Sequence, residues 1–176
     1  MKQKINAFDY ASQITKVLGK GVLLTTKYGG RVNTMTIGWG MLGIEWGKPV
    51  FIALVRESRY TKELLEKNGE FTVNVPCEEF DSKIISFCGT KSGRSVDKVK
   101  ELGLELEEPE AISVPGIRQL PLTLECKVIY TQKQEAGAIP DALLEKYYPC
   151  RADHENARDC HIAFYGEIVN AYIIQD

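Results

Sequence analysis

The chain has 176 residues, with 44% hydrophobic and 26% charged residues and a net charge of −2. These values are ordinary for one soluble globular domain with a sizeable core, so we treat residues 1–176 as a single domain. Because there is no lysine-rich run, nucleic acid and anionic membranes are not expected as main partners. The N-terminal segment lacks the apolar core of a signal peptide, and no run approaches the roughly 20 apolar residues of a membrane span. We therefore expect a cytoplasmic protein.

The first half of the chain reads as one short helix followed by strands. Residues 8–18 place apolar side chains at helical spacing and end at Gly19. Glycine-punctuated runs rich in β-formers then predict strands over 22–26, 33–39, 41–46, 49–55 and 70–75. Between the last two strands, residues 61–68 read as a helix that Gly69 stops.

The second half alternates between short helices and two long strands. Helices are predicted over 80–87, 95–102 and 140–148, and strands over 122–132 and 161–174. Many strands with only local helices favour an antiparallel barrel or sandwich with helices packed on its outside. No Gly-x-Gly-x-x-Gly supports a Rossmann dinucleotide site, and no Gly-x-x-x-x-Gly-Lys-Ser/Thr supports a nucleoside-triphosphate site.

A candidate anion site lies where the strand over 49–55 ends and the helix over 61–68 begins. Arg56, Ser58, Arg59 and Thr61 offer two guanidiniums and two hydroxyls there. Ser58 is a natural N-cap, and a helix N-terminus attracts anions through unpaired N–H groups and its dipole. Guanidiniums add forked, charge-assisted hydrogen bonds. The alternative is an ordinary capped helix with solvated arginines.

A second binding candidate is the glycine-containing loop predicted over 88–94. Its two glycines allow a close approach of backbone to a ligand, and Lys91 and Ser92 add a cation and a hydroxyl beside Gly93. The alternative is a flexible surface connection.

Five cysteines are scattered along the chain without any Cys-x-x-Cys pair. This pattern favours reduced thiols over a disulfide framework. Cys150, His154, Cys160 and His161 invite a zinc interpretation, but their spacings match no paired pattern of structural zinc sites. Cys88, beside the glycine loop, is the thiol that we expect to be redox-sensitive.

Five motifs in order make the chain resemble the flavin reductase-like, FMN-binding split-barrel family. They are residues 33–40 (NTMTIGWG), 56–61 (RESRYT), 71–76 (FTVNVP), 92–98 (SGRSVDK) and 161–167 (HIAFYGE). The flavoredoxin branch looks closest. The resemblance runs from about Lys16 to the C-terminus, and it implies a six-stranded antiparallel Greek-key split barrel with peripheral helices. It also implies a homodimer with FMN near the subunit interface.

The resemblance implies roles for the candidate residues. The segment around Asn33, Thr34, Met35, Thr36 and Trp39 would lie beside the isoalloxazine, although Met35 and Trp39 could equally be barrel core. The group at 56–61 (Arg56, Ser58, Arg59 and Thr61) would hold the FMN phosphate, and Lys91, Ser92 and Gly93 would approach the cofactor.

His161 would line the face where nicotinamide or substrate stacks on the flavin, although a lone histidine at a strand start is more often structural. The implied function is an NAD(P)H-dependent flavin reductase that passes electrons to an acceptor. The alternatives are a flavoredoxin-type electron carrier reduced by a protein partner and an FMN-binding redox sensor. The residues do not choose between NADH and NADPH, and they do not say whether FMN is a tightly held group or a substrate.

Overall fold

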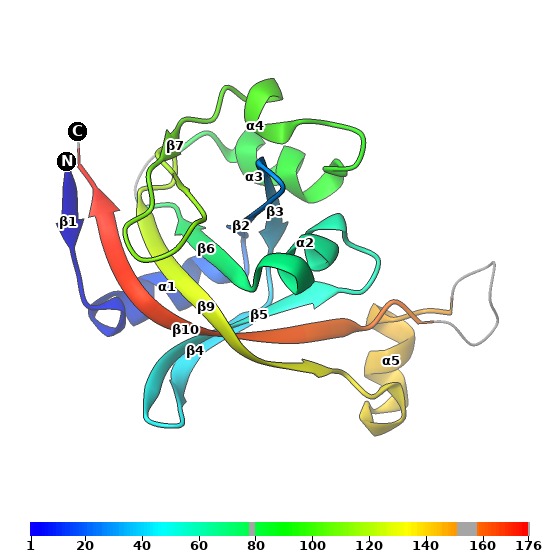
Figure 1. The fold of residues 1–176 in the computed structure, drawn as a ribbon. Helices are drawn as coiled ribbons and strands as arrows, with labels where there is room; N and C mark the ends of the chain where they lie inside the picture. The colour runs from blue at the N-terminus through cyan, green and yellow to red at the C-terminus, as the bar shows by residue number, and fades with distance from the viewer. Residues whose placement is uncertain (78–79, 151–157, 176) are drawn as a thin grey trace.

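The computed structural model describes residues 1–77, 80–150 and 158–175. Its main sheet follows the order β3-β2-β6-β9-β10-β5-β4, with antiparallel pairing throughout (Figure 1). These strands are β2 (Val22–Tyr28), β3 (Arg31–Ile37), β4 (Gly40–Glu45), β5 (Lys48–Arg56), β6 (Glu70–Val75), β9 (Leu122–Lys133) and β10 (His161–Ile174). The expectation of a mainly β fold with peripheral helices is confirmed. The path has seven strands where the resemblance implied six, and all seven correspond to apolar runs in the sequence.

Three short strands were not predicted. β1 (Lys2–Lys4) pairs with the end of β10, so the two ends of the chain lie side by side (Figure 1). β7 (Leu106–Glu107) and β8 (Gly116–Ile117) form a separate two-stranded ribbon. Strands of two or three residues carry too little alternation to be visible in a sequence, because their existence depends on the partner.

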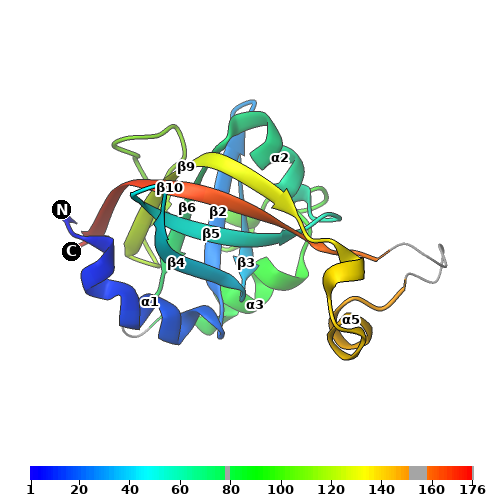
Figure 2. The same cartoon turned by 90° about the horizontal axis from the view of Figure 1, so that it is seen from below.

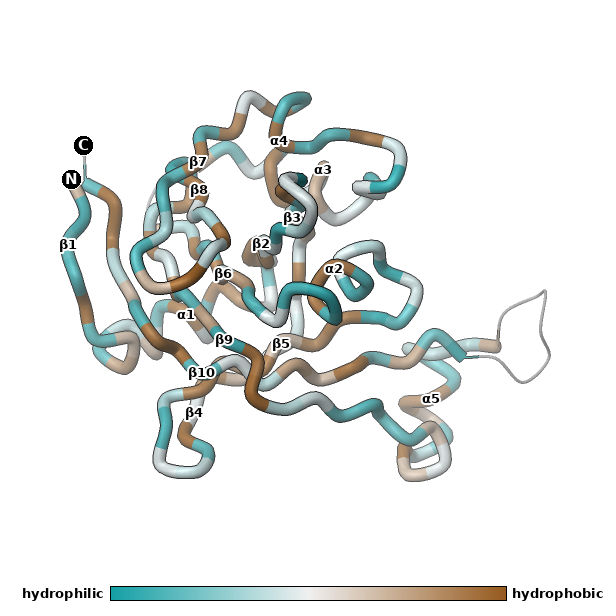
Figure 3. Tube along the Cα trace, viewed as in Figure 1, coloured by the Kyte–Doolittle hydropathy of each residue, from teal (hydrophilic) through white to brown (hydrophobic). Residues whose placement is uncertain are grey.

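The core lies inside the curved sheet. Phe51, Phe71 and Phe164 are fully or almost fully buried there with Leu124, and the tube coloured by hydropathy shows hydrophobic residues along β5 and β10 (Figure 3). Gly166 marks a register shift in β10 opposite β9. A Cβ at this glycine would come within 2.4 Å of the Phe71 ring, so only glycine lets the strand approach the core so closely.

The helices lie on the outside of the sheet, as expected. They are η1 (Ala7–Tyr10), α1 (Ala11–Leu18), α2 (Tyr60–Asn68), α3 (Ser82–Thr90), α4 (Lys98–Glu101), η2 (Ala136–Ala138) and α5 (Asp141–Tyr147). Figure 2 shows α1 along one end of the sheet near β4, and α2 and α3 beside β2 and β3. α2 ends at Gly69, whose φ of 71° is the left-handed conformation typical of a glycine helix stop. Among the helices that the structure describes, none is long and apolar enough to cross a membrane.

Two predicted boundaries around the glycine loop were wrong. α3 continues through Cys88 and Gly89 to Thr90, so the loop begins at Lys91. Gly89 lies inside this helix next to β3, and a Cβ at this position would lie 3.4 Å from the Cβ of Thr36. The helix predicted over 95–102 is reduced to α4, which Asp97 caps by accepting a hydrogen bond from the Lys100 N–H at 3.2 Å.

β9 and β10 carry the chain away from the barrel toward α5. The first five residues of β9 are buried, whereas the following seven are mostly exposed. The exposed part of this hairpin and α5 project to one side in both views (Figures 1 and 2). Tyr148, directly after α5, is nevertheless 4% exposed, because the chain folds back against the start of β10.

Candidate functional site

Two neighbouring cavities lie between the sheet and the α2 and α3 helices, and they share Met35 and Arg59 in their walls. The first, here called the cationic chamber, is lined by residues 58–61, 88–89 and 91–93, with Met35 and Lys98. The second, the aromatic chamber, is lined by residues 35–39 with Leu54, Arg56, Arg59 and His161. Each has a volume of about 180 Å³. Ligand sites are usually larger, about 300 Å³ or more, so one extended ligand would need both.

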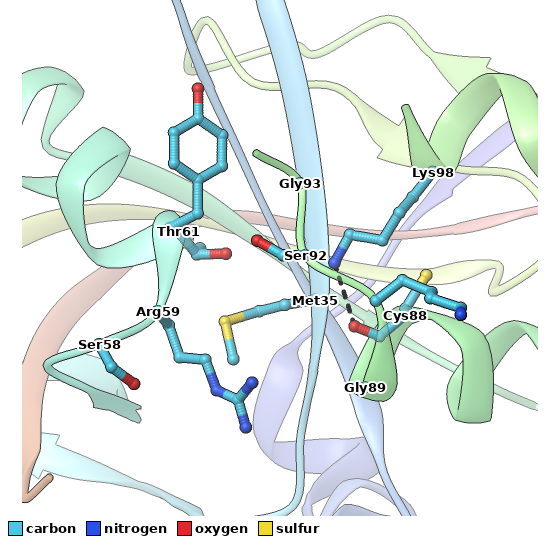
Figure 4. A pocket seen from close by; sticks show the side chains of 11 residues that line it. Met35, Ser58, Arg59, Thr61, Cys88, Gly89, Ser92, Gly93 and Lys98 are labelled. Carbon is cyan, nitrogen blue, oxygen red and sulfur yellow. Dashed lines mark hydrogen bonds between the residues drawn. The ribbon is translucent and has the colours of Figure 1, made fainter. Parts of the chain in front are cut away.

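The cationic chamber gathers positive charge from three segments of the chain. Lys91 comes from the end of α3. Arg59 comes from the start of α2 and Lys98 from the start of α4 (Figure 4). No acidic side chain is among the described residues that line it. An anion is the ligand that this chamber can compensate.

Lys98 is the strongest electrostatic signal in the chamber, and the sequence analysis did not select it. Its side chain is 4% exposed, and its Nζ donates to the Cys88 carbonyl at 3.1 Å (Figure 4). No ion pair to Lys98 occurs among the described residues. Burial lowers the pKa of this ammonium, and Arg59 adds to the effect. A bound anion would offset both the desolvation of the ammonium and its repulsion by Arg59.

The backbone at Gly93 packs directly against the side chain of Asn33 in β3. A Cβ at this position would lie 1.9 Å from the Asn33 Oδ1, and the Arg31 guanidinium donates to the Gly93 carbonyl. Asn33 itself is buried and donates through Nδ2 to the Thr61 Oγ at 2.8 Å. The predicted residues Asn33, Thr61 and Gly93 are therefore brought together, with Asn33 supporting the wall and Thr61 and Gly93 lining it.

The prediction that Ser58 caps α2 was wrong. The N-cap is Arg59, and no side chain caps the helix. Ser58 instead binds Asp159, which accepts from the Ser58 N–H at 2.9 Å and from its Oγ at 2.6 Å. This partner is 101 residues away in the sequence, so local capping rules could not reveal it. Ser58 still lines the cationic chamber, as do the predicted residues Lys91 and Ser92.

The aromatic chamber has one large exposed ring and one buried imidazole. Trp39 is 37% exposed, and its ring lies 4.8 Å from that of His161, measured between centroids. Thr36 also lines the chamber, but its hydroxyl donates to the Ile85 carbonyl at 2.5 Å and thereby ties β3 to α3. Such a wall of rings and apolar atoms suits a flat aromatic ligand.

His161 is buried and held by hydrogen bonds. Its Nδ1 lies 2.7 Å from the Tyr148 hydroxyl. The pKa of His161 is lowered to about 4, mainly by burial and also by Arg56 and Arg59, while Asp159 opposes the shift. The imidazole is therefore neutral at pH 7 and is not a ready source of protons.

Arg56 lies in the aromatic chamber, away from the group at 58–61 with which it was predicted to act. Its guanidinium donates to the Asp159 carbonyl at 2.9 Å and to the Tyr147 carbonyl at 3.0 Å, and it lies 5.1 Å from the centroid of the Tyr148 ring. These contacts tie β5 to the segment after α5. Arg56 is thus partly occupied by the protein, whereas Arg59 borders both chambers.

Thr34 is the one predicted site residue that lies apart from the chambers and their supporting contacts. It is fully buried. Its Oγ accepts a hydrogen bond from the Thr25 Oγ at 3.0 Å and donates one to the Leu24 carbonyl at 3.4 Å. Because successive residues of a strand face opposite sides, Thr34 faces away from its neighbours Asn33 and Met35.

No metal-ligating group that includes a cysteine occurs among the described residues, and the thiol expected to be redox-sensitive is buried. The expected redox sensitivity of Cys88 is not supported, because this thiol is 1% exposed and burial raises its pKa to about 11. No group of three metal-ligating side chains occurs in the described ranges, and His154, one member of the zinc hypothesis, lies outside them.

Comparison with known sequences fits these two chambers. Residues 17–176 match the flavin reductase like domain family. The chain belongs to this family. The first relatives are uncharacterized proteins: one from Archaeoglobus fulgidus is 34% identical over 97 residues, and one from Pyrococcus abyssi is 29% identical over 112. These matches cover 55% and 62% of this chain, and 54% and 62% of the relatives, so the chain spans little more than half of their length.

Solved structures of the family share the fold. Flavoredoxin from Methanosarcina acetivorans is 27% identical, with a TM-score of 0.63 over 88% of this chain and 68% of its own. Flavoredoxin from Desulfovibrio vulgaris is 21% identical, with a TM-score of 0.64 over 88% and 69%. An FMN-binding domain of a flavin reductases-like enzyme from Shewanella baltica is 18% identical, with a TM-score of 0.63 over 98% and 77%. The split-barrel fold expected from the sequence is therefore confirmed.

Proposed function

We propose that the protein is an FMN-binding oxidoreductase, in which NADH or NADPH reduces the flavin and an acceptor then receives the electrons. The observation that carries this proposal is the combination of two neighbouring environments. One chamber contains the buried Lys98, which makes no ion pair with the described residues, and the next contains the neutral imidazole of His161 and the exposed ring of Trp39. A phosphate on one end of a ligand and an aromatic ring on the other match these two environments. Similar structures described as FMN-binding support the same ligand.

The residues present fit FMN. Arg59, Lys91 and Lys98 would hold the phosphate, with the Ser92 and Thr61 hydroxyls as further donors. The close contact at Gly93 leaves no room for a side chain there, which keeps backbone at the chamber wall. Thr36, Trp39 and residues 37–38 would border the ring system. When bound, FMN supplies the hydride-accepting and electron-donating chemistry that amino acid side chains lack.

The chain's own residues would position this chemistry and exclude water. Met35 and Arg59 border both chambers, so they would hold the phosphate end and the ring end of the ligand in fixed positions relative to each other. The neutral His161 would contact the ligand that delivers or receives electrons. Without its proton, it would act through hydrogen bonding and orientation.

A second candidate is an electron carrier that holds FMN but is reduced by a protein partner. The similarity to a flavoredoxin at 27% identity favours it. A redox-sensor function has weaker support, because Cys88, Cys126 and Cys160 are all buried and the pKa of each thiol is raised by burial.

We also propose a homodimer. The exposed Trp46 and Tyr130 form an aromatic cluster with the half-buried Tyr165, in which the Trp46 and Tyr130 centroids lie 5.9 Å apart and those of Tyr130 and Tyr165 lie 5.0 Å apart. Ile44, in the same hairpin as Trp46, is 72% exposed. Apolar surface of this kind favours association with a second copy. FMN would lie near the interface, because β4 starts directly after Trp39 of the aromatic chamber.

The decisive experiment is a visible absorption titration of the purified protein with FMN, followed by anaerobic addition of NADH and then NADPH. Rapid bleaching of bound flavin by either nucleotide supports the reductase and identifies the donor. Binding without bleaching favours the electron carrier. A protein that does not bind FMN would overturn both proposals.

A further inference from the structure

Three side chains at the wall of the aromatic chamber form a closed hydrogen-bond network. The Tyr148 hydroxyl lies 2.7 Å from the His161 Nδ1 and 2.8 Å from the Gln134 Oε1. The same Gln134 oxygen accepts from the backbone N–H of His161 at 3.3 Å. Gln134 follows β9, Tyr148 follows α5, and His161 begins β10, so three separate segments meet at one imidazole.

The network fixes the direction of each hydrogen bond. A backbone N–H can only donate, so the Gln134 atom that faces it must be the amide oxygen. An amide oxygen cannot donate, so the single proton of the Tyr148 hydroxyl must point to Gln134. The phenol oxygen is then the acceptor for His161, and the His161 Nδ1 must carry a proton.

The reverse direction, in which Tyr148 donates to His161, leaves the contact between Tyr148 and Gln134 without a hydrogen. If Tyr148 donated to His161, its oxygen would face the Gln134 oxygen at 2.8 Å with no hydrogen between them. Burial raises the pKa of Tyr148, so its hydroxyl stays protonated and the network keeps its full set of donors. Arg56 also holds the Tyr148 ring in place from the chamber side.

A neutral imidazole carries one proton, and the low pKa of His161 keeps the ring neutral at pH 7. With that proton on Nδ1, the Nε2 atom has only its lone pair. Nδ1 is occupied by Tyr148, so Nε2 is the ring nitrogen left for a ligand in the chamber that His161 lines.

We propose that Tyr148 and Gln134 are positioning residues that hold His161 as the Nδ1–H tautomer, so that Nε2 accepts a hydrogen bond from the substrate. The substrate must then present an N–H or O–H group at this point. The carboxamide of a reduced nicotinamide nucleotide has such a group, whereas the methyl ketone of its 3-acetylpyridine analogue has none. The nature of the substrate rests on the proposed function, but the tautomer does not.

The tautomer can be tested without any ligand. The chain has two histidines, so two-bond ¹H–¹⁵N correlation spectra of the labelled protein at pH 7 give two ring patterns, and a His154→Gln variant assigns them. We expect the proton of His161 on Nδ1. In Tyr148→Phe, which keeps the ring and removes the hydroxyl, the proton should move to Nε2. The exposed neighbour provides the control, because Tyr147→Phe should leave the pattern unchanged.

A Gln134→Leu variant tests the network from its other end. Without the amide oxygen, the Tyr148 proton is free to point to Nδ1, and His161 should again become the Nε2–H tautomer. An Nε2–H pattern in the unmodified protein overturns the proposal at once. A pattern that stays Nδ1–H in both variants would mean that Tyr148 and Gln134 do not control it.

Steady-state kinetics test the consequence for substrate choice. The ratio of kcat/KM for the nicotinamide nucleotide over its 3-acetylpyridine analogue should fall about fivefold in Tyr148→Phe, since a hydrogen bond contributes about 1 kcal/mol. The ratio should be unchanged in Tyr147→Phe. An equal fall for both nucleotides would overturn the assignment of Nε2 as an acceptor. If neither nucleotide is oxidised, the proposed reductase function fails while the spectra still decide the tautomer.

Discussion

The carboxylate of Asp159 occupies both hydrogen-bond donors of Ser58, through the backbone N–H at 2.9 Å and the Oγ at 2.6 Å. These donors border the cationic chamber, so a side-chain anion already lies next to the place proposed for the phosphate. A carboxylate and a phosphate repel each other and compete for the same donors.

Asp159→Asn should therefore tighten FMN binding by about two- to fivefold, the scale of a partly exposed charge pair. Isothermal titration at low ionic strength measures the effect. Asp141→Asn, which removes an exposed acid from the first turn of α5, is the matched control and should change nothing. Weaker FMN binding in Asp159→Asn would mean that the carboxylate supports the site through Ser58.

Replacing Lys98 should weaken the binding of FMN but not the binding of riboflavin. Lys98→Met keeps the length of the chain and removes the buried charge, so the affinity for FMN should fall by about tenfold to a hundredfold. Riboflavin, which lacks the phosphate, should bind with unchanged affinity. Lys100→Met, on the exposed side of α4, is the control. Equal losses for FMN and riboflavin would place Lys98 in the support of the fold and not in phosphate binding.

Gly93→Ala should damage the junction between the glycine loop and β3. The new Cβ would lie 1.9 Å from the Asn33 Oδ1, so the Asn33–Thr61 hydrogen bond cannot persist without a backbone shift. We expect a loss of about 1–3 kcal/mol in the free energy of unfolding, measured by urea denaturation. Gly137→Ala has open space around its Cβ and should be neutral. A stable Gly93→Ala protein with normal FMN affinity would show that this contact is unimportant.

His161 should make the protein less stable in mild acid. Its pKa is about 4 in the folded protein against an ordinary 6.5, so between these values the unfolded chain binds a proton that the folded chain does not. The stabilisation from neutral His161 is complete above pH 6.5 and is lost as pH falls to about 4. Urea midpoints measured across this range should fall less in His161→Gln than in the unmodified protein. Parallel curves would show that His161 titrates normally.

The exposed hairpin of β4 and β5 should control association. Ile44→Lys places a charge in the apolar patch beside Trp46 and should convert a dimer into a monomer in sedimentation experiments. Leu143→Lys introduces the same charge at another exposed apolar site, on α5, and should leave the dimer intact. A chain that is monomeric before substitution would remove the dimer proposal.

Much of the fold was predictable because it follows from local periodicity. The strands over 70–75 and 122–132 and the helix stop at Gly69 follow from neighbouring residues, and all three appear in the structure. The expected alternation of exposure does not, because β6 is buried along almost its whole length and β9 is buried at one end. The helix α3 was predicted to end too early, because a glycine in a sequence is normally taken as a sign of a loop and Gly89 is helical. A glycine within a helix is readable only when the strand that crosses it is known.

The site was predictable only in part. Residues brought to the chambers by motif order, such as Arg59 and Ser92, could be selected from sequence. Lys98 lies in the motif at 92–98 but was not selected, because a lysine at the start of a short polar helix is normally exposed and its burial depends on the fold around it. Gln134 and Tyr148 belong to none of the five sequence motifs. Their importance comes from meeting His161 in space.

The two chambers share Met35 and Arg59, but other parts of their surroundings come from different segments of the chain. Residues 58–61 and 88–98 surround the cationic chamber, whereas His161 and its partners Gln134 and Tyr148 belong to the last third of the chain. Under the proposed function, binding of the FMN phosphate would depend on the first of these segments, and the choice of a reaction partner on the second. Exchanging the segment from 134 to 150 between family members should redirect reactivity while leaving the grip on the cofactor intact.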